Sequence, residues 1–462
     1  MCNVSLNGTQ PTDASIRVLR ALEAAGLEAW YVGGWVRDAL MGRPSHDVDM
    51  CCSGLWQESK AALEAADIAV VESGIKFGGI TAICDGERIE VTTYRLDGFY
   101  TDGRHPQSVE RAASLEDDLA RRDFTVNAMA WHPERGLVDR YDGQGDLKRK
   151  LIRAVGDPKR RFNEDALRML RAVRFACRLD FMIEPETKQA LAECAPLLDA
   201  VARERVGIEL EGILSTGHGG DAMLRYPELV CAAVPELAAG RGFDQRSVYH
   251  AFNVYEHIAR VLTVAGELAL CDGVAPSSSL MWAAFLHDVS KPECFTVDHD
   301  GSGHFYGHPE LGAKKARVIM DRLALSHDLV RDVCLLIKYH DKPLRPERSC
   351  LLNMMRALSG EGVDTPRLMD ELMDLKRADT LGKAPSCFYY VETIEEMRAL
   401  VHELLAAGEP YTLKMLAING GDLIRAGVKP GPELGQLLNA ALDAVIEKNI
   451  PNTRETLLAH LN

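Results

Sequence analysis

Apolar and polar positions follow different patterns in the first third of the chain and in the rest. Before about residue 150, short apolar runs alternate with turns, and residues 28–32 and 72–95 predict strands. Within 72–95, Asp85-Gly86 separates two runs as a hairpin turn would. From about residue 151, apolar side chains recur at helical spacing, as in residues 166–177. The pattern therefore predicts an α+β N-terminal part and an almost wholly helical remainder.

A glycine pair follows the first predicted strand, and two alternating acids begin the next. Gly33-Gly34 is expected to open a helix that carries Arg37, and after a turn the chain reaches Asp47 and Asp49. Glycine allows backbone N–H groups to approach phosphate oxygens closely. Acids two residues apart on a strand share one face, where their repulsion favours a bound cation such as Mg²⁺. The pattern indicates a site for a nucleoside triphosphate and Mg²⁺, with solvent-exposed acids as the alternative.

These residues carry a resemblance to a known family. Gly33-Gly34-x-Val36-Arg37-Asp38 followed by Asp47-x-Asp49 resembles the class II tRNA nucleotidyltransferases, or CCA-adding enzymes, and the bacterial poly(A) polymerases. The resemblance implies a polymerase-β-like palm with a mixed sheet, in which Asp47 and Asp49 are catalytic and hold Mg²⁺. It also implies that Gly33, Gly34 and Arg37 bind the triphosphate. Glu90, on the polar face of a predicted strand, is either a third metal ligand or an exposed acid.

A second motif of this family lies near the end of the N-terminal part. Residues 121–128, Arg-Arg-Asp-Phe-Thr-Val-Asn-Ala, resemble a segment that contacts the ribose and triphosphate. The resemblance makes Arg121, Asp123 and Asn127 nucleotide-binding residues, although paired arginines beside an acid could equally form a surface ion-pair cluster. Residues 96–116 are expected to form a long loop, and the stretch 97–106 within it resembles a loop that CC-only enzymes lack.

A third motif lies in the helical part. Asp165 and Arg168 are three residues apart, which would put them side by side on one helix. A carboxylate accepts from the exocyclic amine of cytosine or adenine and an arginine donates to ring acceptors, so the pair would admit CTP and ATP and reject UTP and GTP. Glu164-Asp165-x-x-Arg168 resembles the amino-acid template of the family. An ordinary helix salt bridge is the alternative.

Capping residues and arginines complete the prediction for this helix. Asp157-Pro158 is expected to begin a helix, and Asn163 to cap the next one, which carries an arginine stripe or simply a solvated side. Residues 203–209 resemble the next family motif, which we expect to buttress the arginine-bearing helix. The candidates for nucleotide binding here are Arg171 and Arg174, and those for RNA binding are Arg178 and Arg203.

Histidine and aspartate residues recur between residues 250 and 341. His287-Asp288 ends an apolar run, and imidazole and carboxylate together suit a transition metal. The set resembles the HD metal phosphohydrolase superfamily, which implies Mn, Ni, Fe or Co as the metal. A helical RNA-binding unit with leftover ligands is the alternative. The implied first position consists of His257, His287, Asp288 and Asp341, and His308 and His340 would complete a second.

Composition and charge change this picture in two respects. The net charge of the 462 residues is −15, which argues against nonspecific coating of nucleic acid, but residues 140–178 carry 12 Lys and Arg against 5 Asp and Glu. Such a band suits a polyanion held in a defined groove. The 12 cysteines are scattered, and neither a secretory signal nor a membrane-spanning run is visible, so we expect reduced thiols and a cytoplasmic protein without membrane contact.

The chain is expected to have four parts. These are a catalytic head or palm at 1–150, a nucleotide-selecting and RNA-binding helical neck at 151–240, an HD-type helical domain at 241–360 and a helical, tRNA-binding tail at 361–462. In the tail, Lys429 lies in a Gly- and Pro-rich turn that could hold an RNA phosphate or simply join two helices.

The expected reaction is template-independent addition or repair of the 3′-terminal CCA of tRNA from CTP and ATP, with release of pyrophosphate. Within the family, poly(A) polymerase and A-adding or CC-adding enzymes are the alternatives. Outside that activity, the alternatives are a metal-dependent phosphohydrolase or 2′,3′-cyclic phosphodiesterase, and a noncatalytic RNA chaperone. The expected partners are the tRNA 3′ end, CTP and ATP, and a homodimer is left open.

Overall fold

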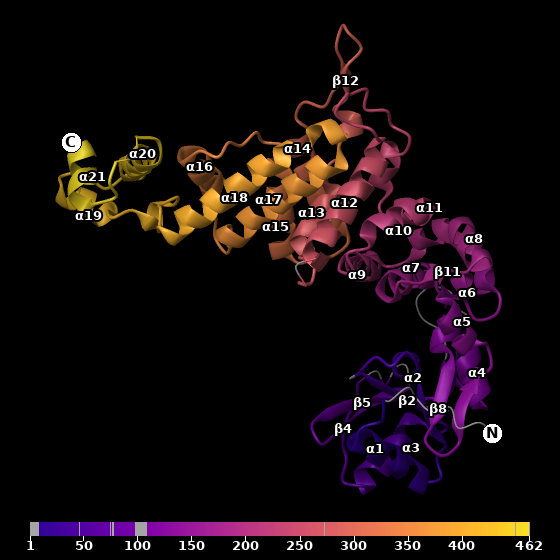
Figure 1. Ribbon diagram of the computed structural model, residues 1–462. Coiled ribbons are helices and arrows are strands. Elements are labelled where there is room, and N and C mark those ends of the chain that lie inside the picture. Colours follow the sequence, from indigo (N-terminus) through magenta and orange to yellow (C-terminus); the bar gives the residue numbers. More distant parts are fainter. Residues whose placement is uncertain are drawn as a thin grey trace. The chain divides into compact units, whose positions relative to one another are not determined.

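The computed structural model describes residues 9–45, 47–73, 75, 78–97, 109–271, 273–448 and 450–461 (Figure 1). The chain divides into two compact units. The first consists of Met1–Leu210 and Tyr226–Ala233, and the second of Glu211–Arg225 and Val234–Asn462. The four-part division expected from the sequence stays a prediction.

A mixed seven-stranded sheet organises the first unit, which confirms the predicted fold class. The strand order is β3-β4-β5-β2-β1-β8-β9, in which β2 and β5 run parallel and all other neighbours run antiparallel. The predicted hairpin turn joins β4 and β5, where Asp85 and Gly86 have positive φ angles of 50° and 83°. The strands are β1 (Ala29–Val32), β2 (Val48–Cys52), β3 (Ala69–Val71), β4 (Gly79–Cys84), β5 (Glu87–Thr93), β8 (Met129–His132) and β9 (Gly136–Asp139).

Two helices cover one side of this sheet. Helices α1 (Asp13–Ala24) and α3 (Trp56–Ala65) pack on each other and on β4 (Figure 1). The apolar side of α1, which includes Val18 and Leu22, is buried. These side chains share one core with Met50 of β2. The core therefore holds in place the strands from which the predicted acids project.

The segment expected to form a long loop is partly structured. Strand β6 (Arg95–Asp97) pairs antiparallel with β7 (Val109–Arg111), and helix α4 (Leu115–Ala120) follows. Ser114 caps α4, because its hydroxyl accepts a hydrogen bond from the backbone N–H of Asp117. Residues 98–106 of the loop expected at 97–106 lie outside the described residues, so its likeness to a CCA-type loop stays a prediction.

The rest of the first unit is mainly helical. Asp157 caps α6 as predicted, whereas Asn163 caps no helix and lies inside α6. The chain leaves helical geometry at Asp165 (φ −146°, ψ 105°), whose carboxylate accepts from the Leu167 N–H and so begins α7. The elements are η2 (Thr125–Asn127), α5 (Gly143–Arg149), β10 (Leu151–Ile152), α6 (Pro158–Glu164), α7 (Leu167–Leu179), β11 (Met182–Ile183), α8 (Pro185–Cys194), η3 (Ala195–Ala200), α9 (Arg203–Leu214) and α11 (Pro227–Ala233).

Helices also form most of the second unit. Helix α13 is apolar on every side and packs against α12, α15 and α17, so the residues that follow its C-terminus lie inside a bundle (Figure 1). No helix in the described part of the chain is long and apolar enough to cross a membrane. The elements are α10 (Gly219–Arg225), η4 (Pro235–Gly240), α12 (Val254–Cys271), α13 (Ser278–Leu286), η5 (Lys291–Glu293), β12 (Thr296–Val297), β13 (Gly303–His304), α14 (His308–Arg322), α15 (His327–Tyr339), α16 (Arg348–Leu358), α17 (Thr365–Gly382), η6 (Pro385–Cys387), α18 (Tyr390–Ala406), η7 (Leu413–Met415), α19 (Gly420–Arg425), α20 (Pro432–Lys448) and α21 (Arg454–Leu461).

Candidate active site

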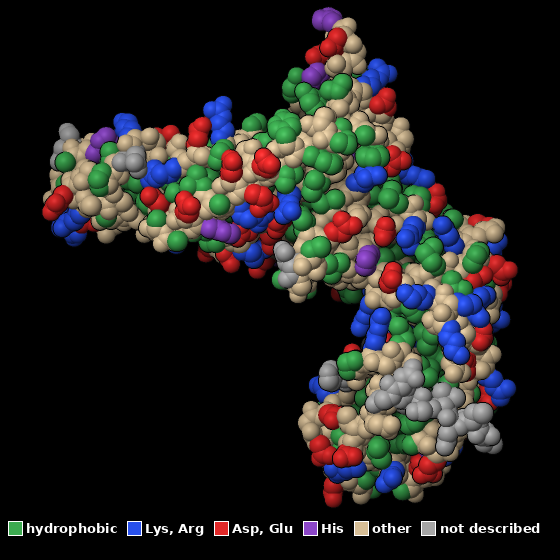
Figure 2. All heavy atoms as spheres, viewed as in Figure 1, with side chains coloured by type: hydrophobic (Ala, Val, Ile, Leu, Met, Phe, Trp, Pro, Cys, Tyr) green, Lys and Arg blue, Asp and Glu red, His purple; other side chains and the backbone are tan. Residues whose placement is uncertain are grey.

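A cavity of about 960 Å³ in the first unit brings the three predicted motifs together. The sheet supplies its acids, and α7 and the segment after α4 supply most of its arginines. Lys and Arg side chains are gathered over the helical part of this unit, where Figure 1 places α6 to α9 (Figure 2). The predicted residues that line the cavity are Gly33, Gly34, Arg37, Asp47, Asp49, Glu90, Arg121, Asp123, Asn127, Asp165, Arg168, Arg171, Arg174 and Arg178.

Three carboxylates lie together on the sheet side of the cavity. Asp49 of β2 is the register partner of Glu90 in the parallel strand β5, and Asp47 directly precedes β2. Burial and the charge of Glu90 raise the pKa of Asp49 to about 6. A hard divalent cation with oxygen ligands would relieve this repulsion, so the donor set fits Mg²⁺.

Gly33 is required by the backbone at this point. Its φ is 69°, which L-residues with a side chain rarely adopt. A Cβ at this position would lie 3.1 Å from Nη1 of Arg122 and 3.6 Å from Oδ2 of Asp49. The glycine therefore allows the side chains of Arg122 and Asp49 to approach the same stretch of backbone.

Arg37 forms part of the cavity wall and its guanidinium is already bonded. Its Nη1 donates to Oδ1 of Asn127 at 2.8 Å, and its Nε donates to Oδ1 of Asp38 at 2.8 Å. Asn127 in turn donates to Oδ1 of Asp123 at 3.3 Å. Three predicted nucleotide-binding residues therefore form one network, with Arg37 almost fully buried at 3% exposure.

Asp118 is a residue that sequence reasoning missed. This fully buried carboxylate accepts from Nη2 of Arg121 at 2.6 Å and from Nη2 of Arg122 at 3.0 Å. Burial alone would raise the pKa of Asp118, but the two arginines outweigh it and hold that pKa below its ordinary value. The spacing of an acid three and four residues before two arginines was the available signal.

Phe175 of α7 lies beneath three of the arginines. Its ring centroid is 5.4 Å from Cζ of Arg37, 5.6 Å from that of Arg171 and 4.8 Å from that of Arg174. Arg171 also donates to Oδ2 of Asp123 at 2.7 Å. These contacts fix the direction of the arginines while their guanidinium groups line the cavity.

Asp165 and Arg168 do not stand side by side on one helix, and that prediction was wrong. The helix break at Asp165 separates them, and Arg168 donates instead to Oε2 of Glu164 at 3.0 Å and to the backbone oxygen of Arg121 at 3.1 Å. Asp165 accepts from Nη2 of Arg205 in α9 at 3.2 Å. Both residues still line the cavity, so base reading by them stays a prediction.

Helix α9 buttresses α7, which confirms the expectation for residues 203–209. Arg174 donates to Oε2 of Glu209 at 2.6 Å, in addition to the contact between Arg205 and Asp165. Nη2 of Arg203 donates a hydrogen bond to Oδ1 of Asp199 at 2.9 Å, and Arg203 is not among the residues that line the cavity. Arg205 is therefore the arginine of this motif that the fold brings to the site.

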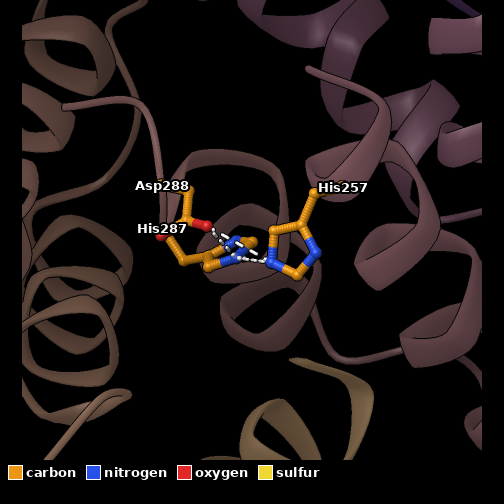
Figure 3. Close-up of side chains that lie close together, drawn as sticks. All are labelled: His257, His287 and Asp288. Carbon is orange, nitrogen blue, oxygen red and sulfur yellow. Dashed lines mark hydrogen bonds and ion pairs between the residues drawn. The ribbon is translucent and has the colours of Figure 1, made fainter. Parts of the chain in front are cut away.

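A second cluster of titratable side chains lies inside the second unit. Nε2 of His257 and of His287 lie 3.3 and 3.2 Å from Oδ2 of Asp288, as Figure 3 shows for these three residues. Nε2 of His308 and of His340 lie 3.4 and 3.7 Å from Oδ1 of the same carboxylate. Two triads, each with ligand atoms within 4.8 Å of one another, therefore share Asp288.

The imidazole orientations in this cluster fit metal binding. In each ring Nδ1 faces a backbone carbonyl, so that Nε2 points into the cluster. Buried imidazole and carboxylate donors together suit a transition metal. The carbonyl partners are Gly382 for His257 at 3.2 Å, Ala284 for His287 at 2.9 Å, Phe305 for His308 at 2.8 Å and Ile337 for His340 at 2.6 Å.

Asp341, predicted as the last ligand of the first position, is exposed after the end of α15 and belongs to neither triad. Instead of Asp341, Asp379 of α17 lies beside the first triad, with its Oδ1 3.1 Å from Nε2 of His257. The sequence offered no local signal for Asp379, because α17 reaches the cluster only through the packing of the bundle.

Lys429, predicted to contact RNA, is exposed in the turn between α19 and α20, and its role stays a prediction.

Comparisons with known proteins identify the family of this chain. The chain matches four family models: the Poly A polymerase head domain at residues 29–153, the probable RNA and SrmB-binding site of polymerase A at 180–239, the HD domain at 254–383 and the putative domain 2 of tRNA nucleotidyltransferase at 386–461. It is 31% identical over 448 residues to the CCA-adding enzyme of Leuconostoc mesenteroides, covering 95% of this chain and 93% of that one. It is 32% identical over 447 residues to the CCA-adding enzyme of Streptococcus mutans, covering 96% and 95%.

The chain is also similar in fold to solved structures of CCA-adding enzymes. The Bacillus stearothermophilus CCA-adding enzyme in complex with CTP superposes with a TM-score of 0.71 at 26% identity, over 98% of this chain and 97% of that one. The Thermotoga maritima CCA-adding enzyme complexed with tRNA shares the fold, with a TM-score of 0.61 at 20% identity over 98% and 95%.

Proposed function

The chain belongs to the family of CCA-adding enzymes, and we propose that it builds or repairs the 3′-terminal CCA of tRNA from CTP and ATP. The observation that carries this proposal is that three carboxylates and a set of arginines line one and the same cavity. The 3′-hydroxyl of the RNA attacks the α-phosphate of the nucleotide, a P–O bond to the new residue forms, and pyrophosphate leaves. The cytoplasm, where tRNA is matured, is the proposed location.

The residues of the cavity divide this work. Asp47, Asp49 and Glu90 would hold Mg²⁺, which supplies charge neutralisation and activation of the attacking hydroxyl. Arg121 and Arg122, oriented by Asp118, offer guanidinium groups to the triphosphate. No RNA or DNA template strand is needed, because selection of the base is assigned to protein side chains.

We assign base selection to the neighbourhood of the break between α6 and α7. Asp165, held by Arg205, offers a carboxylate oxygen to the exocyclic amine that cytosine and adenine share. Arg168, held by Glu164 and the Arg121 carbonyl, offers N–H donors to ring acceptors. Uracil and guanine present a carbonyl at the position of that amine, so the carboxylate would reject them.

The test is addition to three tRNA transcripts that end before CCA, after C and after CC. Each is incubated with Mg²⁺ and with CTP, ATP, UTP or GTP, singly and in pairs, with Asp49→Asn as the inactive control. Ordered addition of two C and one A that then stops supports the proposal. Addition of C alone, of A alone or of long A tails would identify a CC-adding, an A-adding or a poly(A) enzyme. No incorporation at all would favour an RNA chaperone.

The two triads around Asp288 favour a second function, a metal-dependent phosphohydrolase or 2′,3′-cyclic phosphodiesterase. The residues that would hold the metals are His257, His287, Asp288 and Asp379 at one position and Asp288, His308 and His340 at the other. The test is hydrolysis of a 2′,3′-cyclic nucleotide by the full chain with Mn²⁺, Ni²⁺ or Co²⁺. His287→Ala should abolish hydrolysis and keep CCA addition, and Asp49→Asn should do the reverse. Hydrolysis that survives His287→Ala would refute this assignment.

A further inference from the structure

Ile208 of α9 is the one large apolar side chain that is exposed among the described residues lining the cavity of the first unit, with a relative exposure of 62%. The other large apolar residues of this lining, Val32 and Phe175, are buried. An exposed apolar side chain gains little from packing, so its place in a ligand-sized cavity indicates contact with a ligand. Three other large apolar side chains of this unit are exposed in its described part, but outside the cavity lining: Leu55, Val71 and Met182.

The position of Ile208 on α9 places it beside the residues assigned to base selection. Arg205 also lines the cavity and lies three residues before Ile208, on the same side of the helix. Nη2 of Arg205 donates to Oδ2 of Asp165 at 3.2 Å, and Glu209 accepts from Nε of Arg174 at 2.6 Å. These two contacts, on either side of Ile208 in the sequence, hold α9 against α7 and the break before it, while Ile208 itself faces the cavity.

The charges around Ile208 favour an uncharged group over a phosphate. Glu204, four residues before Ile208 and on the same side of α9, is exposed and lines the same cavity. The nearby charge of Arg205 is balanced by Asp165, and the arginines assigned to the triphosphate lie instead on the segment after α4. Glu204 would repel a phosphate, and an isoleucine offers it nothing. A nucleobase is uncharged, has a flat face that packs on apolar side chains, and presents its amine to carboxylates.

We propose that Ile208 is a platform on which the base of the incoming nucleotide packs, and that it contributes to nucleotide affinity without distinguishing one base from another. The inference rests on the proposed nucleotidyltransferase function and adds a contact to the base-binding part of that site. Arg205 and Ile208 then have different tasks on one side of α9. Arg205 holds the carboxylate that meets the exocyclic amine, and Ile208 covers the face of the ring. A purine has the larger face, so ATP should depend on Ile208 more than CTP does.

The test measures binding of CTP, ATP and UTP to the full chain by equilibrium dialysis, with Mg²⁺ and without RNA. Ile208→Ala should raise Kd about 3-fold for CTP and about 5-fold for ATP, and should leave the ratio between CTP and UTP unchanged. Inorganic tripolyphosphate, which has no base, should bind the wild type and this variant equally. Ile208→Leu keeps the apolar bulk and should restore affinity. Val71→Ala, at an exposed position on β3 outside the cavity lining, is the control.

The outcomes separate this inference from the function on which it rests. Unchanged nucleotide affinity in Ile208→Ala would overturn the platform, even if the wild type adds CCA normally. An equal loss for tripolyphosphate would show a general structural role instead. A loss of tRNA affinity alone would assign Ile208 to the terminal base of the RNA. If the wild type binds nucleotides through Ile208 but adds none to tRNA, the platform stands and the transferase function fails. A wild type that binds no nucleotide would overturn both.

Discussion

Glu90 of β5 lies directly across from Asp49 of β2 in the parallel register of the seven-stranded sheet. Their proximity has an electrostatic consequence, because burial and the Glu90 charge raise the pKa of Asp49 to about 6. An acid pair of this kind is unfavourable unless a proton or a cation lies between the two groups. Occupancy of the cavity by Mg²⁺ and the protonation of Asp49 are therefore competing events.

We expect Glu90→Gln to raise the Mg²⁺ concentration needed for half-maximal nucleotide incorporation by about 10-fold, because one oxygen ligand with a charge is lost. Maximal rate at saturating Mg²⁺ should change less. Magnesium titrations of the incorporation rate measure both quantities. Glu87→Gln, on the same strand but outside the cavity, should leave the titration unchanged. An unaltered titration for Glu90→Gln would leave Glu90 as a merely exposed strand acid.

Stability should depend on pH through Asp49. A carboxyl whose pKa is raised by folding binds a proton more tightly in the folded state, so its contribution to the free energy of unfolding increases as the pH falls through about 6 toward 4. Asp49→Asn removes this increment. The difference between wild type and variant, from denaturant unfolding with EDTA at several pH values, measures it. With saturating Mg²⁺ the increment should disappear, and a difference that is independent of pH would contradict the assignment.

Asp118 should act as a positioning residue for the triphosphate. Asp118→Asn weakens the hold on Arg121 and Arg122, and we expect KM for both CTP and ATP to rise about 10-fold or more at unchanged affinity for tRNA. Steady-state kinetics and a tRNA-binding assay separate these effects. Asp117→Asn, one residue away and bonded to Ser114, is the matched control. If tRNA affinity falls as much as nucleotide affinity, Asp118 has a general structural role instead.

Arg205 and Arg203 provide a test of base selection within one helix. Arg205→Ala frees the Asp165 carboxylate, and we expect the preference for CTP over UTP to fall about 10-fold, with a larger fall for Asp165→Ala. Arg203 pairs with Asp199, so Arg203→Ala should keep the preference for CTP over UTP. Competition between labelled CTP and UTP on a transcript that ends before CCA gives the ratio. Equal loss in both arginine variants would place selection elsewhere.

Asp379 and Asp341 should differ in their effect on metal content. Asp379→Asn removes a buried carboxylate beside His257 and should reduce the bound transition metal after dialysis by about half or more, whereas Asp341→Asn should not. Elemental analysis of the purified variants measures the metal. CCA addition should be the same in both. Metal loss in Asp341→Asn alone would restore the ligand set expected from the sequence.

Local patterns predicted the sheet side of the site well. The position of Asp47 just before β2, that of Asp49 within β2 and the turn at Gly33 follow from side-chain alternation and backbone sterics, which the sequence displays directly. The arrangement of Asp165 could not be read in the same way. Its pattern allows either a helix interior or a cap, and tertiary contact with Arg205 accompanies the break that the structure adopts.

Residues that only long-range packing brings to a site could not be predicted from the sequence. Asp379 is 91 residues beyond Asp288 in the sequence, and only the assembly of α12, α13 and α17 brings the two acids to one cluster. His340-Asp341 offered a nearer and more obvious pair, but the histidine alone faces inward. Phe175 was hidden for a similar reason, since a single aromatic residue in the sequence of α7 does not reveal the arginines that surround its ring.

Asp288 gives one carboxylate oxygen to each of its two triads. Any two ions held there would repel each other across a single anion, yet both would depend on that anion. Loading would therefore be stepwise, with a weaker second affinity, and the degree of occupancy would vary with the supply of metal. Replacement of His308 would affect one of the two metal-binding steps, whereas replacement of Asp288 would remove both. The stoichiometry of the cluster is thus a property of one shared side chain.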